Sequence, residues 1–269
     1  MDDRTIEWLI VLCFPNGGST ALAKLLLTAP GAVALRPNAE GQWLIPAMHS
    51  PLHRWNPDTP LDYAGIRRRW MQVARRQAEL GPASDLPPLV IEKSPPNACR
   101  YRPLVSMLSG MPVSVVAMTR EPYATCASWD ARYGQATIDG TWGWVRERPI
   151  DEDSYFEALA GHWLQRAAWL EAARADAVAF FSYEDFADRT QETLAQLARS
   201  LPRLAAVDHR TPVGVKDYPE QTIRNMNLPT IATLTQRRRV AIMRGLSRDP
   251  ELVRRLGYAL AFEQAYPAA

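Results

Sequence analysis

The sequence has no long apolar run. Its first hydrophobic stretch, residues 8–14, is far shorter than the ~18 residues that a membrane-spanning helix needs, and the residues before it are acidic. We therefore expect a protein without a membrane span, in the reducing cytoplasm.

Cysteine is scarce as well. Cys13, Cys99 and Cys126 are odd in number and widely spaced, which argues against a disulfide framework. Together with the four histidines, they show no metal-ligand spacing, so we predict no metal site.

The chain also lacks an excess of one charge. Its 31 basic and 29 acidic residues give a formal net charge of +2, so any anion site must be a local cluster. This balance argues against a dedicated nucleic-acid binder. No internal repeat or low-complexity tract interrupts the 269 residues, of which 47% are hydrophobic, and we expect one domain over residues 1–269.

What the sequence does contain is an alternation of short apolar strands with longer helical stretches. The predicted strands are residues 8–14, 88–91, 113–118 and 177–181, and predicted helices follow at 21–27, 155–175 and 189–201. This order indicates a three-layer α/β/α fold with a central, doubly wound parallel sheet.

Two stretches fall outside that alternation, and a third, basic stretch follows an irregular segment after Pro202. Residues 43–60 are rich in Trp, His and Pro, and residues 133–153 in Gly, Trp and charge. Both are predicted to be loops or lids, where specificity for a second substrate usually resides. Residues 234–246 form a basic amphipathic stretch.

A glycine turn separates the first strand from the first helix. In Gly17-Gly18-Ser19-Thr20, the glycines allow the backbone to come close to a bound phosphate. The backbone N–H groups and the N-terminus of the following helix favour binding of such an anion. An ordinary strand-to-helix turn is the alternative. No lysine precedes Ser19, which argues against a nucleotide triphosphatase. No second glycine completes the G-x-S-x-G motif, which argues against a hydrolase of that type.

A second candidate anion site follows the third predicted strand. Arg120-Glu121-Pro122 stands at the strand end, and Ser128 lies two helical turns further on. An arginine and a hydroxyl at the same sheet edge suit a second phosphate. The alternative is a surface arginine paired with Glu121.

These motifs resemble those of sulfotransferases that use 3′-phosphoadenylyl sulfate (PAPS), which share a P-loop-like fold. Pro15-Asn16-Gly17-Gly18-Ser19-Thr20 is similar to their 5′-phosphosulfate loop, and Arg120 to Ser128 matches their R-[DE]-P-x(5)-S segment for the 3′-phosphate. Tyr183-Glu184-Asp185-Phe186 resembles a further family motif. The likeness implies PAPS as co-substrate and PAP as product. The residues it assigns to the nucleotide are Asn16, Gly17, Gly18, Ser19, Thr20, Ala21, Arg120, Ser128 and Tyr183.

One position departs from the family pattern. Asn16 stands where these sulfotransferases usually have a lysine or arginine against the leaving group. Lys93, at the end of the second predicted strand, is the preferred replacement. Lys216 and Arg224 are further candidates for cofactor contacts, and solvated surface positions are the alternative for both.

A four-residue segment, Glu92-Lys93-Ser94-Pro95, resembles the E-K-[ST]-P element of carbohydrate sulfotransferases. This likeness implies that Glu92 takes the proton of the acceptor, and Lys93 would neutralise the charge that develops on the leaving group. A local Glu92–Lys93 ion pair is the alternative. Glu40 or Gln42, in a short E-G-Q segment, is a further candidate to face the acceptor, and a cap at the start of the next helix is the alternative. His49 and His53 are candidate bases or packing residues.

The sequence thus predicts transfer of a sulfuryl group from PAPS to a hydroxyl or amine of a small-molecule or carbohydrate acceptor, with no metal and no nucleic-acid partner. Two rivals stay open. One is an ATP-dependent P-loop phosphotransferase, which would require magnesium. The other is a degenerate relative that binds the nucleotide without turnover, which Asn16 favours. The sequence does not identify the acceptor or the oligomeric state.

Overall fold

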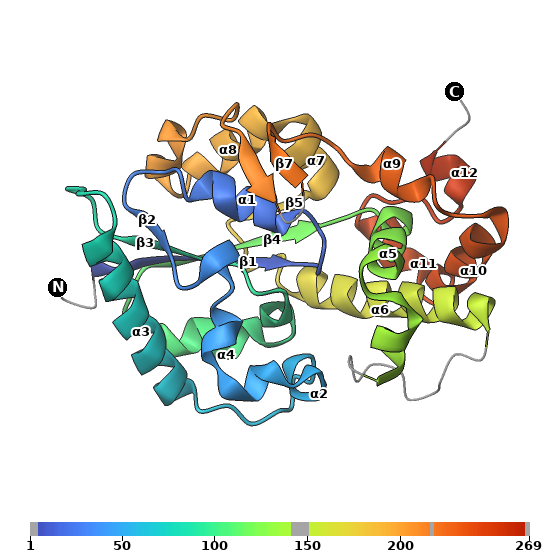
Figure 1. Cartoon of the computed structure of the whole chain (residues 1–269), viewed down its shortest axis with the longest axis horizontal. Coiled ribbons are helices and arrows are strands. Elements are labelled where there is room, and N and C mark those ends of the chain that lie inside the picture. Colours follow the sequence, from blue (N-terminus) through green and yellow to red (C-terminus); the bar gives the residue numbers. More distant parts are fainter. Residues whose placement is uncertain (1–4, 141–150, 216–217, 267–269) are drawn as a thin grey trace.

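A computed structural model of the chain describes residues 5–140, 151–215 and 218–266 (Figure 1). Its centre is a sheet of five parallel strands in the order β2-β3-β1-β4-β5. Helices cover both faces of this sheet, which confirms the predicted three-layer α/β/α architecture. The strands are β1 (Glu7–Cys13), β2 (Ala32–Ala34), β3 (Leu89–Glu92), β4 (Val113–Thr119) and β5 (Ala179–Ser182).

The central strand β1 contributes side chains to two separate cores. Trp8, Ile10 and Leu12 pack into the core on one face of the sheet, and Leu9 and Val11 into the core on the other. All five side chains are fully buried. Because both faces are covered, the strand is a continuous apolar run and not an alternation of apolar and polar residues.

Different helices cover the two faces. The helices α1 (Ser19–Leu26), α7 (Tyr183–Asp188) and α8 (Thr190–Ala198) lie on one face, and α3 (Tyr63–Leu80), α4 (Tyr101–Met107) and α6 (Glu152–Ala172) on the other (Figure 1). The other α-helices are α2 (Pro51–Arg54), α5 (Pro122–Gly140), α9 (Asn227–Ile231), α10 (Gln236–Leu246), α11 (Pro250–Arg255) and α12 (Phe262–Ala265). The 3₁₀ helices are η2 (Pro37–Ala39), η3 (Gly41–Leu44), η4 (Pro46–His49), η5 (Pro95–Arg100) and η6 (Pro202–Ala206). Two further strands, β6 (Val213–Val215) and β7 (Tyr218–Gln221), pair antiparallel with each other.

The four predicted strands correspond to β1, β3, β4 and β5, and the basic stretch at 234–246 contains α10. Two loop predictions need correction. Residues 43–60 contain the second half of η3 together with η4 and α2, because prolines at the starts of η4 and α2 favour short helical turns. Residues 133–153 include the end of α5 and the start of α6, while 141–150 lie outside the described residues.

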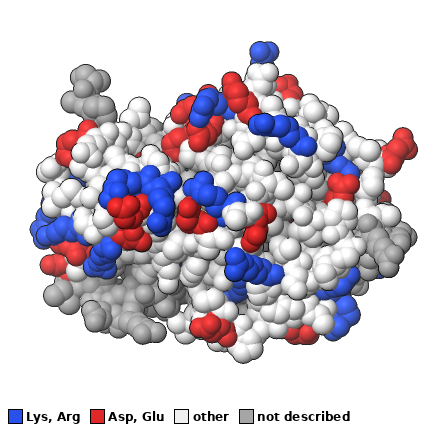
Figure 2. Space-filling model, turned by 180° about the vertical axis from the view of Figure 1, so that it is seen from behind, with Lys and Arg blue, Asp and Glu red and all other residues white. Residues whose placement is uncertain are grey.

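Acidic and basic side chains are interspersed on the face of the molecule seen from behind (Figure 2). Ion pairs join α10 to α6, including Arg244 with Glu157 at 2.9 Å and Arg238 with Glu152 at 2.8 Å. The near-neutral net charge therefore corresponds to a surface on which both signs of charge are mixed on this side (Figure 2). Within residues 5–140, 151–215 and 218–266, no helix is both long and apolar enough to cross a bilayer.

Two helical glycines allow a test of the close packing between α10 and α6. A Cβ on Gly245 would lie 2.6 Å from the Ala160 Cβ, whereas a Cβ on Gly161 would meet only the flexible end of Arg248, at 3.4 Å. Alanine is favoured over glycine in both helices by about 1 kcal/mol. We expect G161A to raise the free energy of unfolding by up to that amount, and G245A to lower it by about 1–3 kcal/mol through overpacking. Urea denaturation checks both values, and a G245A protein as stable as G161A would contradict the packing.

Candidate active site

The turn between β1 and α1 has the backbone of an anion cradle. Asn16 and Gly18 both adopt left-handed conformations, with φ angles of 53° and 83°. A Cβ on Gly18 would lie 2.3 Å from a ring carbon of Tyr183, so only glycine fits there. The first N–H groups of α1 have no partner inside the helix and carry its positive potential. Gly18, Ser19, Thr20 and Ala21 line a cavity of about 900 Å³.

Arg120 borders the cradle on one side. It follows β4 directly, and its Nη1 donates to the Asn16 carbonyl at 2.6 Å. Its Nε donates to the Asn227 Oδ1 at 3.0 Å, and its guanidinium stands 4.7 Å from the centre of the Tyr183 ring. Ser128, on α5, lines the same cavity.

Tyr183 links the cradle to the segment after β7. Its hydroxyl donates to the Arg224 carbonyl at 3.1 Å and accepts from the Met226 N–H at 3.0 Å. Burial raises the pKa of Tyr183, so the hydroxyl stays protonated. Arg224 also lines the cavity.

Lys93 borders the cradle on the other side. It follows β3, its side chain is almost fully buried, and its Nζ lies 3.1 Å from the Thr20 Oγ1 and 2.7 Å from the Glu40 Oε1. A cation from the neighbouring strand thus stands at the first turn of α1, where Asn16 provides none.

Glu92 lies outside the cavity. Its side chain is fully buried and accepts hydrogen bonds from the Gly41 N–H at 2.8 Å, from Asn97 at 3.0 Å and from the Ser94 hydroxyl. Burial raises the pKa of Glu92 to about 7, although these hydrogen bonds and Lys93 act in the opposite direction. This placement does not fit the role of acceptor base, because Glu92 is separated from the cavity that an acceptor would enter.

The carboxylate that does line the cavity is Glu40, between η2 and η3. Its Oε2 accepts from the Trp43 Nε1 at 2.8 Å and from the Gln42 Nε2 at 3.1 Å. Burial alone would raise the pKa of Glu40, but the Lys93 ammonium and these hydrogen bonds outweigh it and hold the pKa below its ordinary value. Glu40 is therefore ionised at neutral pH.

Most of the residues predicted from the sequence meet in this one cavity. Gly17 is buried in the turn without lining it, and Lys216 lies outside the described residues. The predicted residues that line the cavity are Asn16, Gly18, Ser19, Thr20, Ala21, Lys93, Arg120, Ser128, Tyr183 and Arg224. The sequence did not single out Arg54, Arg132 or Tyr133, which line it too, because only the fold brings α2 and α5 beside the cradle.

The histidines lie elsewhere. The His49 Nε2 is 3.1 Å from the Trp43 carbonyl, the backbone carbonyl of His53 accepts from Arg100 at 3.2 Å, and neither residue lines the cavity. Burial holds the pKa of His162 well below its ordinary value, and this side chain is part of the interior. Among the described residues, no three His, Cys, Asp or Glu side chains are grouped to hold a metal ion.

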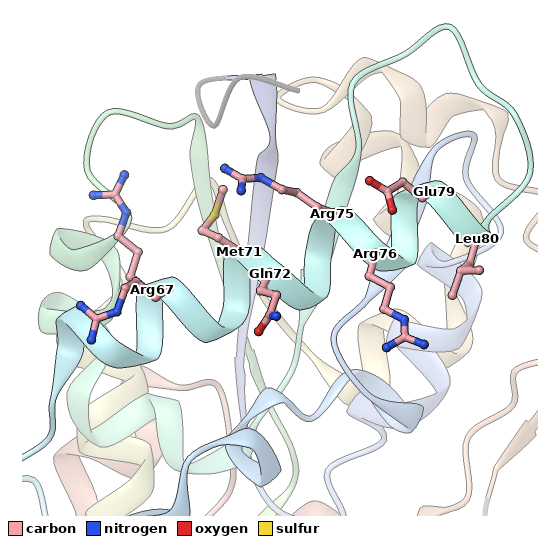
Figure 3. Close-up of a pocket in the computed structure, with 8 residues that line it drawn as sticks. Arg67, Met71, Gln72, Arg75, Arg76, Glu79 and Leu80 are labelled. Atoms are coloured by element: carbon pink, nitrogen blue, oxygen red, sulfur yellow. The ribbon is translucent and has the colours of Figure 1, made fainter.

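A second, smaller hollow of about 600 Å³ lies along α3 (Figure 3). All of its lining residues come from this single helix, among them Arg67, Arg75 and Arg76. It contains no residue from a strand end. The cavity at the cradle, in contrast, collects side chains from the ends of β1, β3, β4 and β5, which is where α/β proteins bind their ligands.

Three solved structures are similar to this chain over most of its length. The sulfotransferase domain from the curacin biosynthetic pathway is 14% identical, with a TM-score of 0.47 over 95% of this chain and 99% of that one. The chain is similar to sulfotransferases. The sulfotransferase domain of the Synechococcus olefin synthase is 16% identical, with a TM-score of 0.49 over 93% and 96% of the two chains. Sulfotransferase STF1 from Mycobacterium tuberculosis is 14% identical, with a TM-score of 0.47 over 89% and 77%.

Comparison at the level of sequence gives no counterpart. No protein-family model matches the chain, and no curated protein matches it.

The buried carboxyl of Glu92 makes stability depend on pH. Its pKa of about 7 in the folded protein exceeds the ordinary value of 4.5, so between these pH values the folded chain holds a proton that the unfolded chain releases. The free energy of unfolding therefore falls as pH rises through this window, by at most about 1.4 kcal/mol per pH unit for each such group. Glu121, whose pKa burial also raises to about 7, adds a second contribution.

We expect E92Q to flatten this pH dependence by about half, and E121Q to remove the other part. Urea denaturation at about pH 5, 6 and 7 measures the slope. A slope in E92Q equal to that of the unsubstituted protein would mean that Glu92 is ionised in the folded state.

Proposed function

We propose that the protein transfers a sulfuryl group from PAPS to a hydroxyl or amine of a small acceptor and releases 3′-phosphoadenosine 5′-phosphate (PAP). The observation that carries this proposal is the pair of cations beside one glycine cradle. Lys93 contacts Thr20 on one side, and Arg120 contacts the Asn16 carbonyl on the other. A nucleotide with phosphates at both ends needs two such groups in a single cavity.

The cradle fits the 5′-phosphosulfate end of the nucleotide. Gly18 leaves no room for a Cβ, and the start of α1 offers N–H donors at Gly18, Ser19 and Thr20. In our proposal the hydroxyls of Ser19 and Thr20 add contacts to the same phosphate.

Arg120 and Ser128 are proposed to bind the 3′-phosphate. The Arg120 guanidinium is held by Asn227 and the Tyr183 ring, which reduces the entropy lost when it binds an anion. Arg224 lines the cavity nearby and is a further proposed contact, and Lys216 is kept as a candidate on its sequence position.

In the transfer step, the acceptor oxygen or nitrogen forms a bond to sulfur while the bond from sulfur to the phosphate oxygen breaks. The electron pair of that bond leaves with PAP, and the Lys93 ammonium stabilises the developing charge. The acceptor's proton passes to a carboxylate. Because Glu40 lines the cavity and Glu92 does not, we assign this role to Glu40 in place of Glu92.

Lys93 can also replace the cation that sulfotransferases usually have at the position of Asn16. A cation at the first turn of α1 is present, although it comes from β3 and not from the cradle itself. This arrangement favours a transferase over a degenerate protein that only binds the nucleotide.

The nucleotide assignment is tested first by thermal denaturation with PAP and, separately, with ATP and magnesium. We expect PAP alone to raise the melting temperature, and R120A to weaken PAP binding by about 10-fold or more through loss of a charge-assisted contact. R67Q, on the surface of α3, is the matched control and should bind PAP like the unsubstituted protein. Stabilisation by ATP alone would replace our proposal with a phosphotransferase.

The assignment of the base is tested with labelled PAPS and a panel of phenols, alcohols and amines. E40Q keeps the size of the side chain but cannot accept the proton, so we expect kcat to fall by about 100-fold or more. The substitution also removes the carboxylate that pairs with Lys93, so the melting temperature with PAP is measured to show that the variant is folded and still binds the nucleotide. E79Q, on α3, is the control. An E40Q protein with undiminished kcat would contradict the assignment, and PAP binding without transfer to any acceptor would favour the degenerate relative.

A further inference from the structure

The cavity has more positive charge than the nucleotide-binding groups account for. Its described lining includes five lysine and arginine side chains, Arg54, Lys93, Arg120, Arg132 and Arg224, against the single carboxylate of Glu40. Lys93, Arg120 and Arg224 are already assigned to PAPS. Arg54 and Arg132 are not, and neither belongs to the cradle or to the strand ends beside it.

A series of contacts places Arg54 on the side of Lys93 that faces away from Arg120. From Thr20 the series runs through Lys93 to Glu40, then to the Trp43 Nε1 at 2.8 Å. The Arg54 guanidinium stands 4.5 Å from the centre of the Trp43 ring. Arg120, in contrast, contacts Asn16 and Tyr183. Arg54 is therefore at the end of the cavity that the acceptor would occupy.

The Arg54 guanidinium is fixed and partly desolvated. Its Nε donates to the Met48 carbonyl at 2.7 Å and its Nη2 to the His49 carbonyl at 3.0 Å. Burial lowers the pKa of Arg54, against the favourable influence of Glu40 and Tyr133. No carboxylate among the described residues forms an ion pair with it. A fixed guanidinium without a carboxylate partner is prepared for an anion from outside the chain.

The walls of this end are aromatic. Trp43, Trp55 and Tyr133 all line the cavity. The Trp55 ring is stacked against Trp169 and supported by Arg166, whose guanidinium lies 4.2 Å from the ring centre. Burial raises the pKa of the Tyr133 hydroxyl, and the charges of Arg132, Glu40 and Arg54 act on the same group. Flat aromatic walls favour a ring-shaped ligand.

We infer that the acceptor is a hydroxylated ring compound with a carboxylate, and that Arg54 binds this carboxylate while the ring packs against the exposed part of Trp43. The inference rests on the proposed function and adds the acceptor class to it. It also explains the position of Glu40, which lies between Lys93 and Trp43 and so between the sulfuryl donor and the ring.

The test compares acceptors that differ only in charge: 3- and 4-hydroxyphenylacetate with their uncharged amides. We expect kcat/KM to be about 10- to 100-fold higher for the better carboxylate than for its amide, as one charge-assisted pairing provides. In R54Q this ratio should fall toward 1, and R54K, which restores the charge without the planar fork, should recover part of it. R67Q on α3 should keep the full ratio. Melting temperatures with PAP show that each variant is folded.

Equal kcat/KM for acid and amide, or an unchanged ratio in R54Q, would overturn the acceptor class and leave the proposed function intact. If neither compound is sulfated, calorimetry measures their binding to the protein saturated with PAP. Binding of the carboxylate but not the amide, lost in R54Q, supports the inference, and absence of binding overturns it. Failure of PAP itself to bind is the distinct result that overturns the proposed function.

Discussion

The arrangement of the candidate site depends on one buried ammonium group. The side chain of Lys93 is 2% exposed, and its pairing with Glu40 at 2.7 Å offsets the cost of removing its charge from water. The same Nζ contacts Thr20, so a single cation joins β3, the start of α1 and the segment before η3. Removal of either partner would leave a buried charge uncompensated. The three elements are therefore held in one mutual arrangement.

Other buried polar contacts extend this rigidity around the cradle. The Trp129 Nε1 donates to the Pro15 carbonyl at 2.7 Å, and the Trp163 Nε1 donates to the Arg120 carbonyl at 2.9 Å. Asn227, which holds Arg120, is itself held by Glu184 at 2.6 Å. Groups fixed in this way lose little entropy when a ligand binds. An anion site that has no lysine in its own loop can thus be assembled from neighbouring strand ends.

The sheet and the position of the residues that we propose to bind the nucleotide could be predicted from the sequence because their signals are local. Four strands are apolar runs, and the cradle and the Arg120 segment follow two of them directly. β2 has only three residues and gave no such signal, and α3 was passed over although Ile66, Trp70 and Ala74 recur at helical spacing. The proposed acceptor side could not be predicted, because Arg54 and Tyr133 come from α2 and α5 and meet only through tertiary packing.

Glu92 shows how a sequence motif can lead to the site although its carboxyl does not line the cavity. Its position at the end of β3 is unusual for a carboxyl, and the structure relates it to the site through Gly41. The Gly41 N–H donates to the Glu92 Oε2 at 2.8 Å, and a Cβ on Gly41 would lie 2.6 Å from that same oxygen. Glu92 thereby fixes the backbone immediately after Glu40. A buried carboxyl with a pKa of about 7 suits this positioning role, since it accepts hydrogen bonds without needing solvent, while the ionised Glu40 faces the cavity. In our proposal, Glu92 positions the backbone and Glu40 accepts the proton, two roles that the sequence motif assigns to Glu92 alone.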